Sequence, residues 1–369
     1  MKKFVYISIF PVPYNVKYCY LLQKYFDTEF WFYIDIFQKD SYRPEWWKVD
    51  IGDKCKILKN VFFINSRKFF TLNIITELNR FDPDIIMLGG FTIPSNYFAY
   101  LWGKRHNKKV IIFTERVRTN KGELKKNNLF RRFIKMLYRN IDMVIVPSED
   151  TIAQFKDVFG YKEKVVLGNY PIDLEKYFAH NYRTKKDFYT YLFPNRLIEI
   201  YNPLLAIDIF YEIQKKYHDS KLLINSEGNL LTKCKELIKK YNLENNVEFL
   251  SEIKSWEELH LVYKRADIMI LPALFSNGNI SISEAMASGL GIVISNKIMG
   301  RSGAFITNGY NGFKCNPTKE EFVECIENYI KNPSLFVEHA NINRLKVKPY
   351  SIEETAVRFN DLVKNHFNN

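Results

Sequence analysis

The stretch Leu271-Pro-Ala-Leu-Phe-Ser276-Asn277-Gly278-Asn279-Ile280-Ser-Ile-Ser-Glu284-Ala-Met-Ala-Ser-Gly289 decides the fold of this chain of 369 residues. An apolar run at 266–271 leads into it, and a second apolar run at 291–295 follows it. Between them, Asn and Gly indicate a loop, and the hydroxyls and carboxylate that come next indicate the start of a helix. The order strand, loop, helix, strand predicts an open parallel sheet that binds a ligand at the carboxyl ends of its strands.

Glu284 lies one turn inside the predicted helix. A carboxylate at this place can accept two hydrogen bonds from the vicinal hydroxyls of a ribose. The N–H groups at the start of the helix can bind a phosphate or sugar oxygen. A capping carboxylate on an ordinary crossover helix is the alternative interpretation, and the pattern alone leaves both open.

The stretch resembles the donor-site motif of the retaining GT-B glycosyltransferases of family 4. That motif is a Glu, seven residues, a second Glu and Ala-Met-Ala-x-Gly. Glu284-Ala-Met-Ala-Ser-Gly289 matches its second half, and Ser276 stands where the first Glu is expected. The resemblance implies that Glu284 binds the ribose of a nucleotide-sugar. It implies a donor-sugar site made of the following residues: Ser276, Asn277, Gly278, Asn279 and Ile280.

A second match follows the predicted strand at 189–193, where the chain reads Pro194-Asn195-Arg196-Leu197. The family has Gly-Arg-Leu here, with a Lys five or six residues later. By resemblance, Arg196 would neutralise the donor diphosphate and stabilise the leaving group, with Asn195 beside it in the donor site. Tyr201 and Asn202 occupy the positions of the Lys. A solvated loop arginine is the alternative for Arg196.

In the first half of the chain, the predicted strand at 109–113 ends in Thr114-Glu115-Arg116. The family supplies a polar residue, often His, to the reacting sugar from this position. The resemblance makes Glu115 and Arg116 candidate catalytic residues, with Glu115 contacting the acceptor hydroxyl or acting as its base. A helix-capping or salt-bridged carboxylate is the alternative.

The formal charge of +13 is unevenly distributed along the chain. Residues 1–185 hold 32 Lys and Arg against 19 Asp and Glu, whereas residues 186–369 hold 22 of each kind. This asymmetry favours a polyanionic partner for the first half, either nucleic acid or an anionic membrane. No zinc site, recognition-helix motif or RNA-binding motif accompanies it, so we expect no nucleic-acid partner.

The densest basic segment, residues 128–139, alternates apolar and basic residues at helical spacing. Its apolar stripe consists of Leu129, Phe130, Phe133, Met136 and Leu137. Its basic residues are Arg131, Arg132, Lys135 and Arg139. The pattern suits a helix on a membrane surface, and it equally suits an amphipathic helix with its stripe in the core. The two interpretations are compatible.

Composition adds three expectations. The five cysteines are scattered without a CxxC pair, and the six histidines show no metal spacing, so we expect free thiols in a reducing compartment, no metal and no cofactor. Apolar runs fall short of about 18 residues, the length of a transmembrane helix. The apolar segment within residues 1–10 is interpreted as the first strand rather than as a signal peptide.

Two successive α/β segments predict an α/β fold of the GT-B type, with two doubly wound Rossmann-like domains facing across a cleft. We expect an acceptor domain at 1–175, a nucleotide-sugar domain at 176–345, and a C-terminal helix at 346–369 that packs back on the first domain. The predicted function is retaining transfer of a sugar from a nucleotide-sugar to a lipid-linked saccharide. The reaction would occur at the cytoplasmic face of the cell membrane, in surface polysaccharide synthesis.

Two other functions stay open at this stage. A non-catalytic GT-B binding or partner protein is favoured by the missing first Glu and the missing Lys. A GT-B nucleotide-sugar epimerase would share the fold, but its expected acid and base residues are not found.

Overall fold

The fold is that of a computed structural model. It describes residues 1–35, 45–65, 68–90, 92–116, 118–119, 122–123, 129–161, 164–184, 186–251, 253–276 and 279–367. The chain forms two compact units. Unit 1 comprises the chain up to Pro171 and from Ile352 onward, and unit 2 comprises Ile172–Ser351 with a short segment ending at Trp46.

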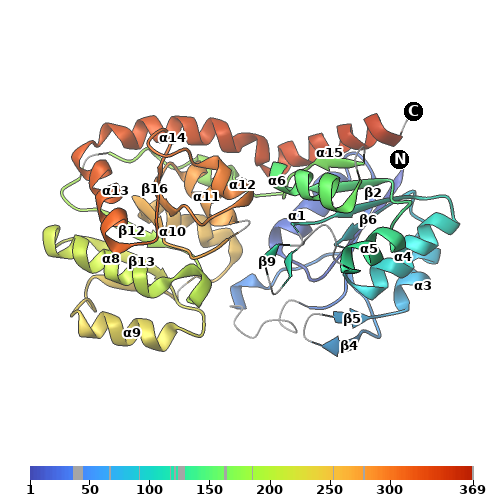
Figure 1. The fold of residues 1–369 in the computed structure, drawn as a ribbon, viewed down its shortest axis with the longest axis horizontal. Coiled ribbons are helices and arrows are strands. Elements are labelled where there is room, and N and C mark those ends of the chain that lie inside the picture. Colours follow the sequence, from blue (N-terminus) through green and yellow to red (C-terminus); the bar gives the residue numbers. More distant parts are fainter. Residues whose placement is uncertain are drawn as a thin grey trace. The chain divides into compact units, whose positions relative to one another are not determined.

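Unit 1 is built on a parallel sheet (Figure 1). Within the described residues its strands run, in order across the sheet, β11 (Val165–Leu167), β10 (Met143–Val146), β7 (Lys109–Phe113), β6 (Ile85–Gly89), β1 (Lys3–Ser8), β2 (Asp27–Phe32) and β3 (Cys55–Ile57). Alternate side chains enter different cores, Val5 and Ile7 on one face and Phe4 and Tyr6 on the other. Both faces are therefore apolar, as a parallel sheet covered on both sides requires.

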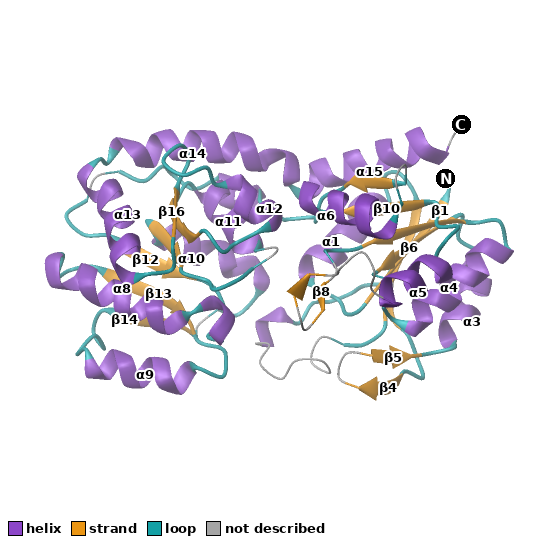
Figure 2. Ribbon diagram, viewed as in Figure 1, coloured by secondary structure: helices purple, strands orange, loops and turns teal. Residues whose placement is uncertain are grey.

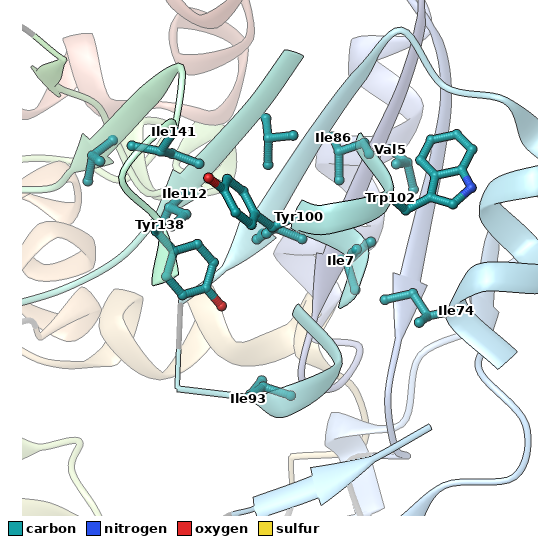
Figure 3. Close-up of a cluster of buried hydrophobic side chains, with 14 of the residues drawn as sticks. Val5, Ile7, Ile74, Ile86, Ile93, Tyr100, Trp102, Ile112, Tyr138 and Ile141 are labelled. Atoms are coloured by element: carbon teal, nitrogen blue, oxygen red, sulfur yellow. The ribbon is translucent and has the colours of Figure 1, made fainter. Parts of the chain in front are cut away.

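Two sets of helices cover these faces. Helices α3 (Asn73–Phe81), α4 (Pro94–Arg105), α5 (Leu129–Leu137) and the π-helical turn η2 (Gln154–Phe159) supply buried side chains to the Val5 face. Figure 3 shows part of this core, where Tyr100 and Tyr138 lie near Ile112 and Ile141. Helices α1 (Pro13–Leu22) and α15 (Ile352–Phe367) cover the Phe4 face, where the rings of Phe4 and Phe359 are 5.1 Å apart.

Shorter elements complete unit 1. They are the helix α6 (Glu149–Ala153) and the antiparallel pairs β4 (Phe62–Asn65) with β5 (Lys68–Phe70) and β8 (Arg118–Thr119) with β9 (Gly122–Glu123). The turn η1 (Glu45–Trp47) lies where the chain briefly joins unit 2, at Pro44–Trp46. Pro13 and Pro94 stand at the starts of α1 and α4, where the missing proline N–H leaves no helical hydrogen bond unmade.

Unit 2 contains a second parallel sheet (Figure 2). Its strands, among the described residues, run β14 (Val247–Leu250), β13 (Lys221–Asn225), β12 (Thr190–Phe193), β15 (Ile268–Leu271), β16 (Gly291–Ser295) and β17 (Phe313–Cys315). Numbered along the chain this is the order 3-2-1-4-5-6, in which ligands bind where the strand order reverses, between the first and fourth strands. Those strands are β12 and β15, and the loops after them carry Asn195-Arg196 and Ser276–Asn279.

Helices lie on both faces of the second sheet. They are α7 (Glu175–Phe178), α8 (Pro203–Lys216), α9 (Leu231–Lys240), α10 (Leu259–Arg265), α11 (Ile280–Ser288), α12 (Gly300–Phe305), α13 (Lys319–Lys331) and α14 (Ser334–Val347), with the turns η3 (Glu199–Tyr201), η4 (Trp256–Glu258) and η5 (Lys348–Tyr350). The predicted fold class, two doubly wound α/β domains, is confirmed.

The main segment of unit 2 begins and ends at neighbouring points of the chain. It runs from Ile172 to Ser351, and these two residues form an isolated parallel β-bridge. The last helix, α15, packs on α1 and so belongs to unit 1.

Candidate active site

Glu284 lies on the central helix α11, of which residues 282–288 are all buried. Only 5% of Glu284 is exposed. The Tyr177 hydroxyl on α7 donates to Glu284 Oε1 at 3.2 Å, and the Tyr263 hydroxyl on α10 donates to Oε2 at 2.5 Å. Three helices thus converge on one carboxylate.

Burial raises the pKa of Glu284 to about 7, while the hydrogen bonds from Tyr263 and Tyr177 act to lower it. Burial also raises the pKa of each tyrosine well above its ordinary value, and the neighbouring carboxylate adds to this. Both hydroxyls therefore remain protonated donors at neutral pH. The acid and carboxylate forms of Glu284 are both populated near pH 7.

The start of α11 brings together polar groups from two loops. Asn279, buried and at the N-cap position, follows β15, and Asn195 follows β12. The Ser281 hydroxyl lies between them, donating to Asn195 Oδ1 at 3.1 Å and to Asn279 Oδ1. Asn279 Nδ2 has no hydrogen-bond partner among the described residues. An amide donor is therefore available where a sugar or phosphate oxygen is expected.

Ser302 of α12 fixes this loop from the other side. Its buried hydroxyl accepts from the Asn279 N–H at 2.8 Å and donates to the Asn279 carbonyl at 3.2 Å. Ser276 is buried, and its carbonyl accepts from the Met299 N–H at 2.8 Å. Ile280 is half-buried and opens the helix, while Asn277 and Gly278 lie outside the described residues.

Arg196 is half-buried in the loop after β12. The next residue, Leu197, donates its N–H to the Glu227 carbonyl at 2.6 Å. Gly228 closes on this loop with a φ of +137°, and a Cβ added there would lie 2.3 Å from the Leu197 carbonyl oxygen. A glycine is required for this close approach, which holds the Arg196 backbone against the end of β13.

Unit 1 holds a cavity of about 520 Å³ at the carboxyl ends of its strands. Its wall is rich in aromatic and hydroxyl groups, drawn mainly from the strand ends, the loop before α1, residues 167–171 and α15. The Thr355 hydroxyl of α15 lines it, is buried, and has no hydrogen-bond partner among the described residues. This volume accommodates a ligand the size of one or two sugar rings.

Glu115 and Arg116 are placed differently with respect to this cavity. Glu115 lines it, is exposed, and accepts a hydrogen bond of 2.8 Å from the Tyr170 hydroxyl. Arg116 does not line the cavity; its Nη1 donates to Asp150 Oδ2 at 3.0 Å, near the start of α6.

Helix α5 carries the predicted basic segment. Ile134 within it and Tyr138 just after it are buried in the core of unit 1 and attach the helix. Figure 3 shows Tyr138 in this core. The apolar residues on another side, Leu129, Phe133 and Met136, are 77%, 52% and 62% exposed. The core contact of this helix and its exposed apolar stripe are therefore different sets of residues.

Basic residues accompany this exposed stripe. Three of the predicted four are exposed on or beside α5, namely Arg132, Lys135 and Arg139. The fourth, Arg131, and the stripe member Phe130 have side chains outside the described residues.

Sequence reasoning missed the polar partners that shape the site in unit 2. Tyr177 and Tyr263 lie 107 and 21 residues from Glu284 along the chain, and Ser302 lies 23 residues from Asn279. No motif marks two tyrosines among the 24 in the chain.

In the described parts of the chain, no group of three or more His, Cys, Asp or Glu side chains is placed to hold a metal ion. Nor does any helix in those parts have the length and apolar character needed to cross a membrane.

Unit 2 is a doubly wound α/β domain with a buried carboxylate on the helix that follows the strand-order reversal. The sequence model described as "Glycosyl transferases group 1" matches residues 176–348, and that described as "Glycosyltransferase Family 4" matches residues 57–176. The chain thus belongs to the group 1 glycosyltransferases of the GT-B fold, and it is a glycosyltransferase.

Three similar proteins illustrate this relationship. An uncharacterized glycosyltransferase of Methanocaldococcus jannaschii is 27% identical over 303 residues, which are 72% of this chain and 71% of the relative. The crystal structure of Anabaena HepE in complex with UDP has a TM-score of 0.73 and 13% identity, covering 98% of this chain and 100% of HepE. The lipopolysaccharide outer core galactosyltransferase WaaB has a TM-score of 0.64 and 15% identity, covering 98% of this chain and 99% of WaaB. The two structural likenesses concern the fold.

Proposed function

We propose that the chain transfers a sugar from a nucleotide-diphosphate sugar to a hydroxyl of a saccharide acceptor, with retention of the anomeric configuration and without a metal cofactor. The observation that carries this proposal is the buried Glu284, at the strand-order reversal of a doubly wound sheet. The UDP complex of HepE, a protein of the same fold, supports a nucleotide donor.

In this proposal, unit 2 binds the donor. Glu284 accepts the ribose hydroxyls, and Arg196 faces the diphosphate, whose negative charge grows as the bond to the sugar breaks. The polar groups around the start of α11 bind the donor sugar. These groups are Ser276, Asn279, Ile280 and Asn195, with Asn277 and Gly278 completing the loop.

Unit 1 binds the acceptor in its aromatic cavity. An acceptor hydroxyl oxygen forms a bond to the anomeric carbon while the bond from that carbon to the nucleotide diphosphate breaks. Glu115 contacts the attacking hydroxyl and can receive its proton, because the carboxylate lines the cavity and is exposed. Arg116 supports this region through its ion pair with Asp150.

We further propose that the acceptor is lipid-linked and is met at an anionic membrane surface on the cytoplasmic side, in surface polysaccharide synthesis. The exposed Leu129, Phe133 and Met136 would enter the headgroup region while the basic residues of α5 contact anionic lipids. The fold shared with a lipopolysaccharide galactosyltransferase supports this acceptor class.

The donor is tested by thermal shift with UDP, GDP, dTDP and CDP on the wild type and on Glu284→Gln. A ligand at one hundred times its Kd stabilises a protein by about 2.7 kcal/mol, which such a measurement resolves. We expect one nucleotide to stabilise the wild type and not the variant. Stabilisation by none of them would contradict the donor site.

The reaction is tested with the sugar donor of the selected nucleotide. We expect the glycosidic bond formed to keep the anomeric configuration of the donor, as read by NMR of the product. We also expect the rate to be unchanged by EDTA. An inverted product, or a rate abolished by the chelator and restored by a divalent metal, would contradict retention or metal independence.

The membrane surface is tested by sedimentation with vesicles of phosphatidylglycerol and phosphatidylcholine. Phe133→Ser with Met136→Ser, and separately Arg132→Glu with Lys135→Glu, should each weaken binding at least tenfold. Leu345→Ser is the matched control, because Leu345 is 76% exposed on α14 of unit 2. Equal binding by all variants would contradict the role of α5.

A further inference from the structure

Glu284 accepts hydrogen bonds from two protein hydroxyls, which contact with a ribose alone would not require. Two tyrosines from two other helices reach the two oxygens of one buried carboxylate. We propose that Tyr177 and Tyr263 are positioning residues of the donor site, which hold Glu284 so that its remaining lone pairs accept the 2′- and 3′-hydroxyls of the nucleotide. This inference rests on the proposed function, in which Glu284 binds the ribose.

The Glu284 carboxylate can accept more hydrogen bonds than the two tyrosines donate. Its two oxygens offer about four lone-pair sites. Tyr177 uses one site on Oε1, and Tyr263 uses one on Oε2. One site therefore remains on each oxygen, which is the pair that a vicinal diol needs for two parallel hydrogen bonds.

The packing around Tyr177 and Tyr263 restricts the motion of both side chains. Tyr177 is 5% exposed and Tyr263 is 1% exposed. Their rings meet edge to face, with centroids 5.3 Å apart and planes at 77°. The Tyr177 ring also lies 6.1 Å from that of His180 and 6.2 Å from that of His260. Side chains locked by such packing fix the direction from which each hydroxyl approaches, and with it the orientation of the carboxylate.

Binding of both ribose hydroxyls requires the ionised form of Glu284. A protonated Glu284 carries its own O–H donor and loses one acceptor position, so it cannot receive both ribose hydroxyls. The tyrosine hydroxyls favour the charged form, which burial disfavours, so the two hydrogen bonds keep a usable carboxylate fraction near neutral pH.

Few other ionisable groups surround the carboxylate on the helices packed against α11. His180, after α7, has a pKa lowered to about 4, chiefly by burial, so it is neutral across the range of interest. His260 lies on α10, where it stacks on His180 with ring centroids 5.7 Å apart. Arg344 on α14 donates to the backbone carbonyls of Ala287 and His180. Within the described residues, the hydrogen-bond partners of the Glu284 oxygens are hydroxyls rather than cations.

The affinity for a ribonucleotide should therefore depend on pH. With one ionisation near pH 7, the affinity of the wild type for a ribonucleotide should fall about tenfold between pH 8 and pH 6. Removing a tyrosine hydroxyl should raise the pKa of Glu284, so the fall should begin at higher pH. The fold-loss of affinity in Tyr263→Phe should therefore be greatest at pH 6 and should nearly vanish at pH 9.

The experiment is titration calorimetry with UDP, or with GDP if the nucleotide panel selects guanine, from pH 6 to pH 9. It compares the wild type, Tyr263→Phe and Tyr177→Phe. Tyr191→Phe is the matched control, since Tyr191 is a tyrosine of unit 2 with 1% exposure on β12 and makes no contact with Glu284. The 2′,3′-dideoxy nucleotide carries the same phosphates, so it corrects for titration of the ligand itself.

We expect a shifted pH profile in Tyr263→Phe and Tyr177→Phe, the wild-type profile in Tyr191→Phe, and weak binding of the dideoxy nucleotide with no shift between variants. An affinity lowered equally at every pH, or a profile identical to the wild type, would overturn the positioning role while leaving the donor site intact. Failure of the wild type to bind either nucleotide at any pH would overturn the proposed function itself, and this inference with it.

Discussion

Two glutamates, one in each unit, accept a hydrogen bond from tyrosine in very different surroundings. Glu284 in unit 2 is buried on a central helix and held by two hydroxyls. Glu115 in unit 1 is exposed at the wall of a cavity and accepts a hydrogen bond from Tyr170. The contrast teaches that a similar tyrosine contact can hold a carboxylate inside a packed core, where burial raises its pKa, or at an exposed cavity wall.

The same contrast extends to the regions around the two glutamates. The site in unit 2 is a set of short polar contacts among α7, α10, α11, α12 and the loops after β12 and β15. The candidate site in unit 1 is a cavity with aromatic walls. Side chains held by many hydrogen bonds suit a ligand with a constant part, such as a ribose, whereas an aromatic cavity suits acceptors that differ in shape. The following predictions test this division, from the largest expected effect to the smallest.

The largest effect should come from Glu284→Gln. The folded protein raises the pKa of Glu284 from 4.5 to about 7, so the stability linked to its proton is present below pH 4.5 and is lost as pH rises through 7. At pH 8 the variant should be more stable than the wild type, by on the order of 3 kcal/mol, because glutamine does not ionise. Nucleotide binding should be lost.

The measurement is denaturant unfolding of both proteins at pH 5 and pH 8, with Glu115→Gln as the exposed counterpart. The stabilisation should be large at pH 8 and several-fold smaller at pH 5, and Glu115→Gln, which leaves the buried carboxylate in place, should not reproduce it. A Glu284→Gln protein less stable than the wild type at pH 8 would break the comparison between the two carboxylates.

Glu115→Gln should instead impair transfer. A group that contacts or deprotonates the attacking hydroxyl contributes at least about a hundredfold to the rate, so kcat should fall by about that factor. The Kd of the nucleotide should be unchanged, because Glu115 belongs to unit 1. Steady-state kinetics together with calorimetry separate the two, and a weakened nucleotide Kd would contradict the assignment of Glu115 to the acceptor.

Gly228→Ala should cost about 2 kcal/mol of stability and weaken nucleotide binding. Its φ of +137° and the 2.3 Å approach to the Leu197 carbonyl leave no room for a Cβ, and the loop that carries Arg196 must shift. Gly90, at the end of β6 in unit 1, has a φ of +83° with no atom within 4 Å of an added Cβ. Gly90→Ala should therefore cost about 1 kcal/mol, from backbone strain alone. Equal losses in the two variants, by denaturant unfolding, would refute this difference.

The smallest effect should come from Tyr170→Phe. It removes one hydrogen bond to an exposed carboxylate, worth about 1 kcal/mol, so transfer should slow by no more than about fivefold. The pH profile of nucleotide binding should stay that of the wild type. A shift like that expected for Tyr263→Phe would show that exposure does not separate the two glutamates.

Much of the fold was predictable because buried parallel strands form short apolar runs that end in loop residues. The same rule placed Asn279 and Glu284 at the ligand-binding edge of a sheet, and the family resemblance added Asn195. The hairpin β4–β5 and the strand β3 were not predicted. They fall in aromatic, polar sequence whose pairing depends on the neighbouring sheet and helices.

Side-chain partners were much harder to predict. The hydroxyls of Tyr177 and Tyr263 reach Glu284 only because α7 and α10 pack on α11, and no local pattern encodes that packing. Arg116 was predicted at the site from its position after the strand at 109–113. In the structure, it forms an ion pair with Asp150 of α6. The apolar stripe of α5 was visible in the sequence, but packing decided that Ile134 is buried while Phe133 is exposed.

The bridge between Ile172 and Ser351 has a consequence for how the chain is made. Apart from the short segment Pro44–Trp46, unit 2 is the continuous stretch Ile172–Ser351, whose two ends meet, so a ribosome can release this stretch as a folding unit. Unit 1 stays unfinished until α15 emerges, and α15 supplies Thr355 and Phe359 to the wall of its cavity. The nascent chain therefore completes the main segment of unit 2 before it completes the cavity of unit 1, although most of unit 1 is synthesised first.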